Sequence, residues 1–272
     1  DEETSKKNQN LRNELWALVD NVMLVRSEKN PTTEFYPTCH MYHTSSYHHF
    51  GPQDAKDRLA GLWHNFFWER QNWRKEGETR LGALQDAAKM MVCAEDLGAV
   101  PKEAYEVLDE LGILGLRIQR WPQHGPFGCP DHYGYLTIAT PSCHDCSTVR
   151  GWWREDKARC QEFYRAFFGS NPPNDCEEWV SRKVVEQHMN SSSMWTIIPI
   201  QDYVDMAPEL RSKDPTKDAI NRPGETDGCW KYRTPYTMEH LLLNCDEFNK
   251  SLMGIVEVAG RTDCYGLGKN LE

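Results

Sequence analysis

“MMVCAEDLG” (residues 90–98) is a short apolar run that ends at two acidic residues, as a buried strand does where it meets a loop. It is followed by “PKEAYEVLDELG” (101–112), which has a proline at its start and a glycine at its end, the usual signals of a helix. A second apolar run, “LGLRIQRW” (114–121), comes next. A strand, a helix and a strand in this order predict two parallel strands joined by a crossover helix, and hence an α/β protein.

The same alternation continues toward the C-terminus. We expect strands at about 90–94, 114–120, 135–140 and 195–200, and a helix in “DCEEWVSRKVVEQHM” (175–189). This pattern fits an open doubly wound sheet or a (β/α)8 barrel. A closed barrel needs eight strands, and about 250 residues is its typical length. The four strands expected here therefore predict the C-terminal half of a (β/α)8 TIM barrel with helical insertions.

The N-terminal part is organised differently, as a mainly helical segment with a loop. Apolar residues at helical spacing predict a helix in “LRNELWALVDNVMLV” (11–25). The Tyr- and His-rich stretch 34–50 has no period and is expected to be an ordered loop, and a long helix is predicted over about 54–90. We accordingly divide the chain into residues 1–88 and the half barrel, residues 89–272.

Composition and charge exclude several classes of function. The 272 residues include 31 Lys and Arg against 41 Asp and Glu, a formal net charge of -10, so we expect no nucleic-acid partner. No apolar run approaches the roughly 18–20 residues that span a bilayer, so we expect no membrane partner. Ten cysteines are too few for a disulfide scaffold, and the N-terminus carries no secretion signal. These features predict a cytoplasmic protein.

Polar and acidic side chains follow three of the predicted strands. These are Glu95 and Asp96, His144 and Asp145, and Gln201 and Asp202. Catalytic side chains of barrels sit at the carboxyl ends of strands, although a single acid there is often only a helix N-cap. Aromatic residues occur nearby in the sequence, namely Trp121, Trp152, Trp153 and Trp230. Carboxylates beside aromatic platforms are what a glycoside-processing site uses, so the pattern favours carbohydrate chemistry.

Longer motifs around these residues resemble a known family. They are “CAEDLGAVPKEAYEVLDELGILGLRIQR” (93–120), “PSCHDCSTVRGWW” (141–153), “IIPIQD” (197–202) and “INRPGETDGCWKYR” (220–233). In order and spacing they resemble the 4-α-glucanotransferases of glycoside hydrolase family 77, the amylomaltases or disproportionating enzymes, and most closely the plant-type cytosolic form. The likeness extends upstream through “NVMLVR” and “WHNFFWERQNWRK”, and so covers nearly the whole chain.

The resemblance implies a role for each residue that matches a family motif. Glu95 corresponds to the general acid/base, and Asp96 to a residue that binds the sugar. Asp145 corresponds to the carboxylate that stabilises the transition state, and His144 to a residue that bonds to the same glucose unit. A retaining mechanism needs a protonated carboxyl beside the leaving oxygen and ionised carboxylates beside the oxocarbenium-like carbon, which agrees with these roles.

Arg117 and Trp230 complete the predicted substrate-binding residues. The indole of Trp230 offers a flat face on which a sugar ring can stack. Arg117 lies on a predicted strand, where an arginine pairs with an acid for structural reasons as often as it has a functional role. The substrate implied is an α-glucan or malto-oligosaccharide, and no metal or organic cofactor is implied.

One family motif is absent. The family's nucleophile is an Asp in an Arg-x-Asp-His motif on an earlier strand, and this sequence has no such motif. Its Asp-His pair, Asp131-His132, lies after Glu95 and is not preceded by the Arg. Plant-type members carry an insertion between nucleophile and acid/base. We therefore expect this chain to start within or just after that insertion, with the N-terminal part of the same polypeptide missing. A smaller departure is Cys229, where bacterial members have Asn.

The sequence thus predicts a 4-α-glucanotransferase that acts on α-1,4-glucans by a retaining mechanism and is inactive as this chain alone. The alternative is a non-catalytic glucan-binding or scaffold protein that kept the sugar-contacting residues. An upstream Arg-x-Asp-His motif in the full-length coding sequence would favour the enzyme, and a native start near Asp1 would favour the alternative.

Two groups of residues raise the question of a metal. Cys143 and Cys146 form a Cys-x-x-Cys motif around His144, a spacing used by zinc sites and by redox pairs. No second pair with ligand spacing follows, so neither use is the favoured prediction. The histidines at 40, 43, 48 and 49 are more typical of a hydrogen-bonded surface loop than of a metal site.

Overall fold

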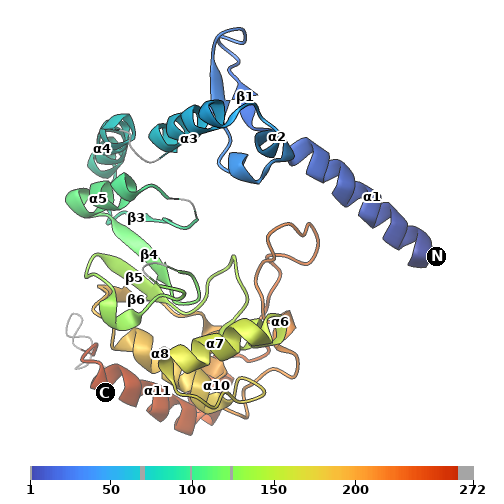
Figure 1. The fold of residues 1–272 in the computed structure, drawn as a ribbon. Coiled ribbons are helices and arrows are strands. Elements are labelled where there is room, and N and C mark those ends of the chain that lie inside the picture. The colour runs from blue at the N-terminus through green and yellow to red at the C-terminus, as the bar shows by residue number, and fades with distance from the viewer. Residues whose placement is uncertain (1, 68–70, 99, 123–124, 263–272) are drawn as a thin grey trace. The chain divides into compact units, whose positions relative to one another are not determined.

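The computed structural model describes residues 2–67, 71–98, 100–122 and 125–262. The chain divides into two compact units, whose elements are labelled in Figure 1. Unit 1 comprises Asp1–Lys89 and Ala99–Val107, and unit 2 comprises Met90–Gly98 and Leu108–Glu272. Within the described residues, no helix combines the length and the apolar character needed to cross a membrane.

Unit 1 contains helices and a small hairpin. Its helical elements are α1 (Glu2–Asp20), the 3-10 turn η1 (Met41–His43), α2 (Ser45–His48), α3 (Gln53–Phe67) and α4 (Gln71–Ala87). The strands β1 (Leu24–Arg26) and β2 (Phe35–Pro37) pair antiparallel, with Val25 opposite Tyr36. The long helix predicted over 54–90 is seen as α3 and α4, and residues 68–70 lie outside the described residues.

The hairpin corrects two predictions about unit 1. The helix predicted over 11–25 ends at Asp20, and the loop predicted over 34–50 begins with a strand. A tertiary contact is the reason, since the Asn21 side chain accepts a hydrogen bond from the Ser45 amide and donates one to the Ser45 hydroxyl, each at 2.7 Å. Asn makes such bonds in place of helical ones, and no periodicity in the sequence reveals the distant partner.

Unit 2 is built on one parallel sheet. Its strands are β3 (Cys93–Ala94), β4 (Leu114–Ile118), β5 (Thr137–Thr140) and β6 (Trp195–Thr196). The order of the strands in the sheet, β3-β4-β5-β6, is the same as their order in the sequence. In the first pair, Ala94 of β3 lies opposite Gly115 of β4. Each predicted strand is present and the α/β class is confirmed. The described strands form an open sheet, and they do not close into a barrel.

Helices lie between β3 and β4, between β5 and β6, and after β6. They are α5 (Lys102–Leu111) before β4; α6 (Val149–Glu155), α7 (Lys157–Phe167) and α8 (Glu178–Met189) before β6; then α9 (Ile200–Val204), α10 (Met238–Asn244) and α11 (Asp246–Val258). Short 3-10 turns are η2 (Pro130–His132) and η3 (Pro215–Lys217). Gly112 has a φ of 65°, the left-handed conformation that ends a helix, as expected. Figure 1 shows α7, α8, α10 and α11 gathered on one side of the strands.

The main apolar cluster of unit 2 joins α6, α7 and α8. Its centre is Phe163, which is 2% exposed and whose ring centroid lies 5.4 Å from those of Phe127 and Trp152. Trp152 and Trp153 both belong to this buried cluster. The expectation that these two indoles serve as sugar platforms is therefore wrong, because their faces are used in packing the core.

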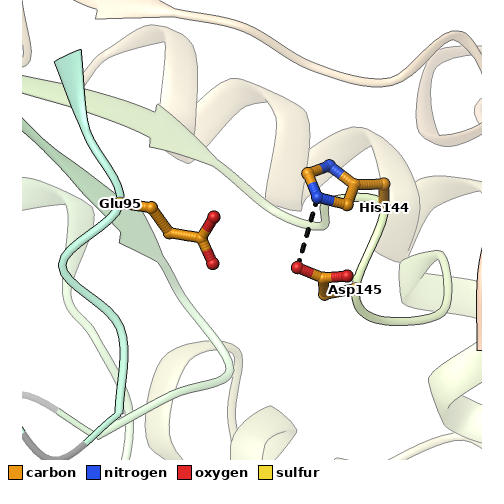
Figure 2. Close-up of side chains that lie close together, drawn as sticks. All are labelled: Glu95, His144 and Asp145. Atoms are coloured by element: carbon orange, nitrogen blue, oxygen red, sulfur yellow. Dashed lines mark ion pairs between the residues drawn. The ribbon is translucent and has the colours of Figure 1, made fainter. Parts of the chain in front are cut away.

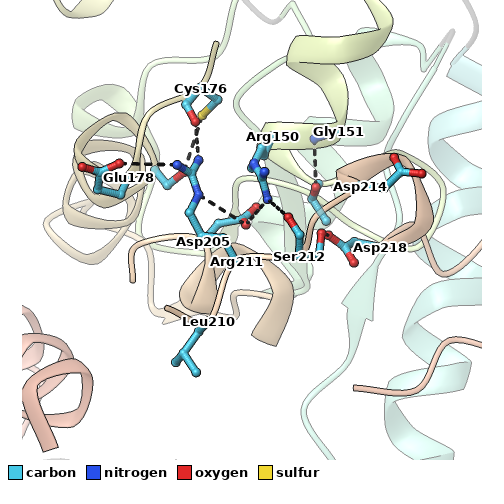
Figure 3. Close-up of polar contacts among 12 residues, drawn as sticks. Arg150, Gly151, Cys176, Glu178, Asp205, Leu210, Arg211, Ser212, Asp214 and Asp218 are labelled. Carbon is cyan, nitrogen blue, oxygen red and sulfur yellow. Dashed lines mark hydrogen bonds and ion pairs between the residues drawn. The ribbon is translucent and has the colours of Figure 1, made fainter. Parts of the chain in front are cut away.

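A buried charge network fixes the position of α6 (Figure 3). Arg150 Nη1 lies 3.3 Å from Asp205 Oδ1 and donates to the Ser212 carbonyl at 2.7 Å. Arg211 Nε lies 3.9 Å from the same Asp205 oxygen. Burial and the nearby charge of Asp202 raise the pKa of Asp205 to about 7, against the attraction of Arg150. The network matters for function because α6 begins directly after the loop that carries two of the predicted site residues.

Candidate active site

The two acids after β3 have different surroundings. Glu95 is exposed, whereas the Asp96 side chain is 2% exposed. Asp96 accepts a hydrogen bond from the Leu116 amide at 2.7 Å, and its Oδ2 lies 2.6 Å from Arg117 Nη1. Successive side chains of an extended chain point to opposite faces, which explains why neighbouring acids are separated in this way.

Gly115 makes room for the ion pair between Asp96 and Arg117. A Cβ atom at position 115 would lie 2.6 Å from Asp96 Oδ2 and 2.8 Å from Arg117 Nη1. Both side chains therefore cross the strand at the one residue without a side chain. The sequence predicted that Asp96 and Arg117 bind substrate, and the structure gives them this contact with each other; contact with a sugar stays a prediction.

His144 and Asp145 lie in the turn after β5. His144 Nε2 is 3.2 Å from Asp145 Oδ2, and Asn221 Nδ2 donates to Asp145 Oδ1 at 3.1 Å. Each carboxylate oxygen of Asp145 thus has a polar partner. Asn221 was not singled out from the sequence, although it lies in one of the quoted motifs, because an amide before a Pro-Gly turn carries no signal of a distant partner.

Glu95 meets these two residues in space (Figure 2). A ligand atom from each of Glu95, His144 and Asp145 lies within 4.8 Å of the others. Figure 2 shows the Glu95 carboxylate directed toward Asp145 from the opposite side of the gap. Enzymes that cleave glycosidic bonds use a pair of carboxyl groups, one on each side of the bond that breaks. An imidazole with two carboxylates is also a donor set that could hold a cation.

The loop that carries His144 and Asp145 is held at both ends by Asp202. This carboxylate accepts hydrogen bonds from the Ser142 hydroxyl and from the Val149 amide, the latter at 2.8 Å. Asp202 is 2% exposed, and burial raises its pKa against the effect of the two hydrogen bonds. The sequence grouped Asp202 with the other acids that follow predicted strands, whereas its buried position makes it a support for the loop.

Trp230 is the exposed aromatic residue beside this site. It is 65% exposed, and its ring centroid lies 5.2 Å from that of His144. Its φ is 60°, a left-handed conformation that is rare and strained for a bulky residue. The Trp230 amide donates to the Ile220 carbonyl at 2.7 Å, which closes the loop and helps to hold this conformation. Backbone strain of this kind is often found at functional positions.

Comparison with known proteins by sequence gives a matching family model and several relatives. A family model described as 4-alpha-glucanotransferase matches residues 26–238. The chain is similar to the 4-alpha-glucanotransferase DPE2 of Oryza sativa subsp. japonica, with 35% identity over 94% of this chain and 28% of the relative. It is also similar to the 4-alpha-glucanotransferase of Chlamydia trachomatis serovar D, with 27% identity over 68% of this chain and 38% of the relative. The chain therefore spans less than half the length of these relatives.

A solved structure also resembles the chain. It is the amylomaltase from Streptococcus agalactiae in complex with acarbose, with a TM-score of 0.50 and 22% identity. The match covers 68% of this chain and 35% of the amylomaltase chain. At this identity the likeness concerns the fold alone, and it agrees with the parallel α/β arrangement of unit 2.

Proposed function

Since the chain belongs to the 4-alpha-glucanotransferase family, we propose that it provides the acid/base side of a site that transfers segments of α-1,4-glucan by a retaining mechanism. Glu95 protonates the leaving oxygen and later accepts the proton of the incoming hydroxyl. Asp145 stabilises the positive charge that develops on the sugar ring. The observation that carries the proposal is the meeting of Glu95 and Asp145 from the ends of two different strands, with His144, within 4.8 Å.

The proposed substrate is an α-1,4-glucan or malto-oligosaccharide. The exposed indole of Trp230 next to His144 supports stacking on a glucose ring at the point where His144 can reach a hydroxyl. We keep Asp96 and Arg117 in the proposed site because their ion pair fixes the backbone beside Glu95. Direct contact of Asp96 and Arg117 with sugar is part of this proposal.

The nucleophile and the remaining strands are proposed to lie in another part of the same polypeptide. The 272 residues contain no Arg-x-Asp-His motif, and the relatives are longer than this chain. The strand order β3-β4-β5-β6 supports a TIM barrel, in which each crossover advances by one strand, because a doubly wound sheet reverses direction at its switch point.

We further propose a cytoplasmic enzyme that uses no metal or organic cofactor. Carboxylates alone can supply both the acid/base and the nucleophile of a retaining reaction, so the chemistry requires no cofactor. A reducing compartment is supported by the sequence, since ten cysteines in 272 residues are too few for a disulfide scaffold.

The test is an assay with maltotriose, whose disproportionation yields glucose and longer malto-oligosaccharides. We expect no transfer by the 272-residue chain alone, and transfer by a longer polypeptide that includes an upstream Arg-x-Asp-His motif. In the longer polypeptide, Asp145→Asn should remove activity because it removes the stabilising charge. Asp131→Asn, an exposed change in η2, is the matched control. Transfer by the 272-residue chain alone would show that a nucleophile lies within it.

A non-catalytic glucan-binding or scaffold protein is the alternative function. Trp230 favours it as much as it favours the enzyme, because an exposed indole binds sugar without any reaction. A longer polypeptide that contains the nucleophile motif, binds glucan and transfers nothing would support this alternative. Its glucan binding would then be insensitive to Asp145→Asn.

A further inference from the structure

Two thiols flank His144 and Asp145 of the proposed site. The Sγ atoms of Cys143 and Cys146 lie 3.9 Å apart, and both residues are partly exposed. The Cys146 amide donates to the Cys143 carbonyl at 3.3 Å, which closes a β-turn with His144 and Asp145 at its centre. The reaction proposed above has no use for either thiol.

The turn brings the two cysteines within reach of a disulfide. The Cα atoms at the ends of a β-turn are less than about 7 Å apart, and disulfides join Cα atoms at about 4.4–6.8 Å. The sulfur atoms need only approach from 3.9 Å to the bonding distance of about 2.05 Å. We propose that Cys143 and Cys146 form a thiol–disulfide modification site that controls the position of Asp145.

The chemistry is exchange with a small-molecule disulfide such as oxidised glutathione. The Cys146 thiolate attacks one sulfur of the reagent, forms a mixed disulfide and releases one thiol. Cys143 then loses its proton to solvent, attacks Cys146 Sγ and releases the second thiol. Two protein thiols are oxidised to one disulfide, and one reagent disulfide is reduced to two thiols.

The surroundings make Cys146 the attacking residue. The hydrogen bond with Cys143 and the positive charge of Arg120 lower the pKa of the Cys146 thiol to about 7. The same hydrogen bond and burial raise the pKa of Cys143. Arg120 is held in place by two bonds to Ser147, at 3.1 Å to its hydroxyl and 2.6 Å to its carbonyl. A cysteine that is thiolate near neutral pH and lies beside a cation is the usual attacking partner of a redox pair.

Disulfide formation would directly change the position of Asp145. The Asp145 amide donates to Cys143 Sγ at 3.3 Å, and the Cys143 amide lies 3.3 Å from Cys146 Sγ. Both contacts depend on the present positions of the sulfur atoms, so their approach shifts the turn that presents Asp145 and His144. The loop cannot follow as a whole, because Asp202 holds its two ends through Ser142 and Val149.

A zinc site is a weaker use of the same thiols. Structural zinc needs four ligands at tetrahedral geometry. Among the described residues, the group of three or more potential ligands near this turn is Glu95, His144 and Asp145, and neither thiol belongs to it. The pair therefore lacks the additional ligands that a zinc ion requires.

The first experiment tests the modification itself and does not depend on the proposed function. The 272-residue chain is treated with oxidised glutathione, free thiols are alkylated, and the tryptic peptide 121–150 is fragmented by mass spectrometry. We expect a bond between Cys143 and Cys146 that dithiothreitol reverses, in the wild type and in the control Cys129→Ser, but not in Cys146→Ser or Cys143→Ser. A bond from Cys129 to either residue would overturn the proposal. Glutathionylation of the exposed Cys39 shows that the reagent has reacted, so alkylation of both Cys143 and Cys146 in the same sample would also overturn it.

The second experiment rests on the proposed function and uses a longer polypeptide that transfers glucan. Oxidation should lower its turnover at least tenfold, dithiothreitol should restore it, and Cys146→Ser should be insensitive to oxidation relative to its own reduced state. Unchanged turnover with the disulfide present would refute control of Asp145. If no longer polypeptide transfers glucan, the proposed function fails, and the mass measurement still decides whether the modification site exists.

Discussion

The side-chain amide of Asn221 donates a hydrogen bond of 3.1 Å to Asp145 Oδ1 from 76 residues further along the chain. With His144 on the other oxygen at 3.2 Å, it fixes the plane of a carboxylate that is proposed to face the reacting sugar. Asn221 is therefore a positioning residue, and its effect should appear in turnover and not in the binding of glucan.

In a longer polypeptide that transfers glucan, we expect Asn221→Ala to lower turnover roughly 10- to 100-fold, because a hydrogen bond to a charged group is worth about 1.5–3 kcal/mol. KM should change little. Asn190→Ala, at the exposed end of α8, is the matched control. Steady-state kinetics with maltotriose separate the two constants, and a rise in KM alone would assign Asn221 to substrate binding instead.

In the full-length enzyme, Glu95→Gln should lower turnover by roughly 10²–10⁴-fold while leaving glucan binding within a few fold. The amide keeps the shape of the side chain but cannot protonate the leaving oxygen. Turnover is measured with maltotriose and binding by calorimetry, with the exposed Glu209→Gln as the control. Retention of more than about a tenth of wild-type turnover is incompatible with the acid/base role.

Trp230→Gly and Trp230→Ala should differ in stability but not in binding. Loss of the ring removes about 0.5–1.5 kcal/mol of stacking, so KM should rise roughly 2- to 10-fold in both variants. The φ of 60° costs alanine about 1–2 kcal/mol that glycine does not incur, so the Gly variant should be the more stable by about that amount. Urea unfolding measures the difference. An unchanged KM in both variants would remove Trp230 from the proposed substrate site.

Asp96→Asn distinguishes a structural ion pair from a sugar contact. The Asp96 side chain is 2% exposed and accepts from two donors, so the amide should lower the free energy of unfolding by about 1–3 kcal/mol. Asp131→Asn, an exposed change, should have no such effect. A variant as stable as the wild type but with a raised KM would instead support direct binding of sugar by Asp96.

His188 should make unit 2 sensitive to acid. It is fully buried, its Nδ1 lies 2.7 Å from the Val184 carbonyl, and burial lowers its pKa from 6.5 to about 4. The unfolded chain therefore takes up a proton near pH 6.5, whereas the folded chain does so only near pH 4. The stability supplied by neutral His188 is complete above pH 6.5 and is lost as the pH falls toward 4, by about 3 kcal/mol in total.

Asp205 has the opposite effect on stability as the pH falls. Burial raises its pKa to about 7, so the folded chain takes up this proton at a higher pH than the unfolded chain does. The effect of His188 must therefore be isolated by comparison of the wild type with His188→Gln in urea unfolding at several pH values. We expect the difference in unfolding free energy between them to shrink as the pH falls from 6.5 to 4. A constant difference would mean that His188 keeps the same charge in both states over that range.

The strands and helices of unit 2 could be predicted from the sequence because each is specified by residues close together in the chain. The run before Glu95, the proline and glycine around α5, and the acidic residues after strands are local signals. The predicted site residues Glu95, His144 and Asp145 also come together in space, since parallel strands present their carboxyl ends at one edge of a sheet.

What only the tertiary structure decided is which side chains are used for packing and which remain available. Trp152 and Trp230 look alike in the sequence, yet one is in the core and the other is 65% exposed. Asp202 and Asp145 both follow strands, yet one is buried as a support and the other faces Glu95. Burial and hydrogen-bond partners depend on contacts between residues far apart in the chain, such as Asn221 with Asp145, and no local pattern of residues encodes them.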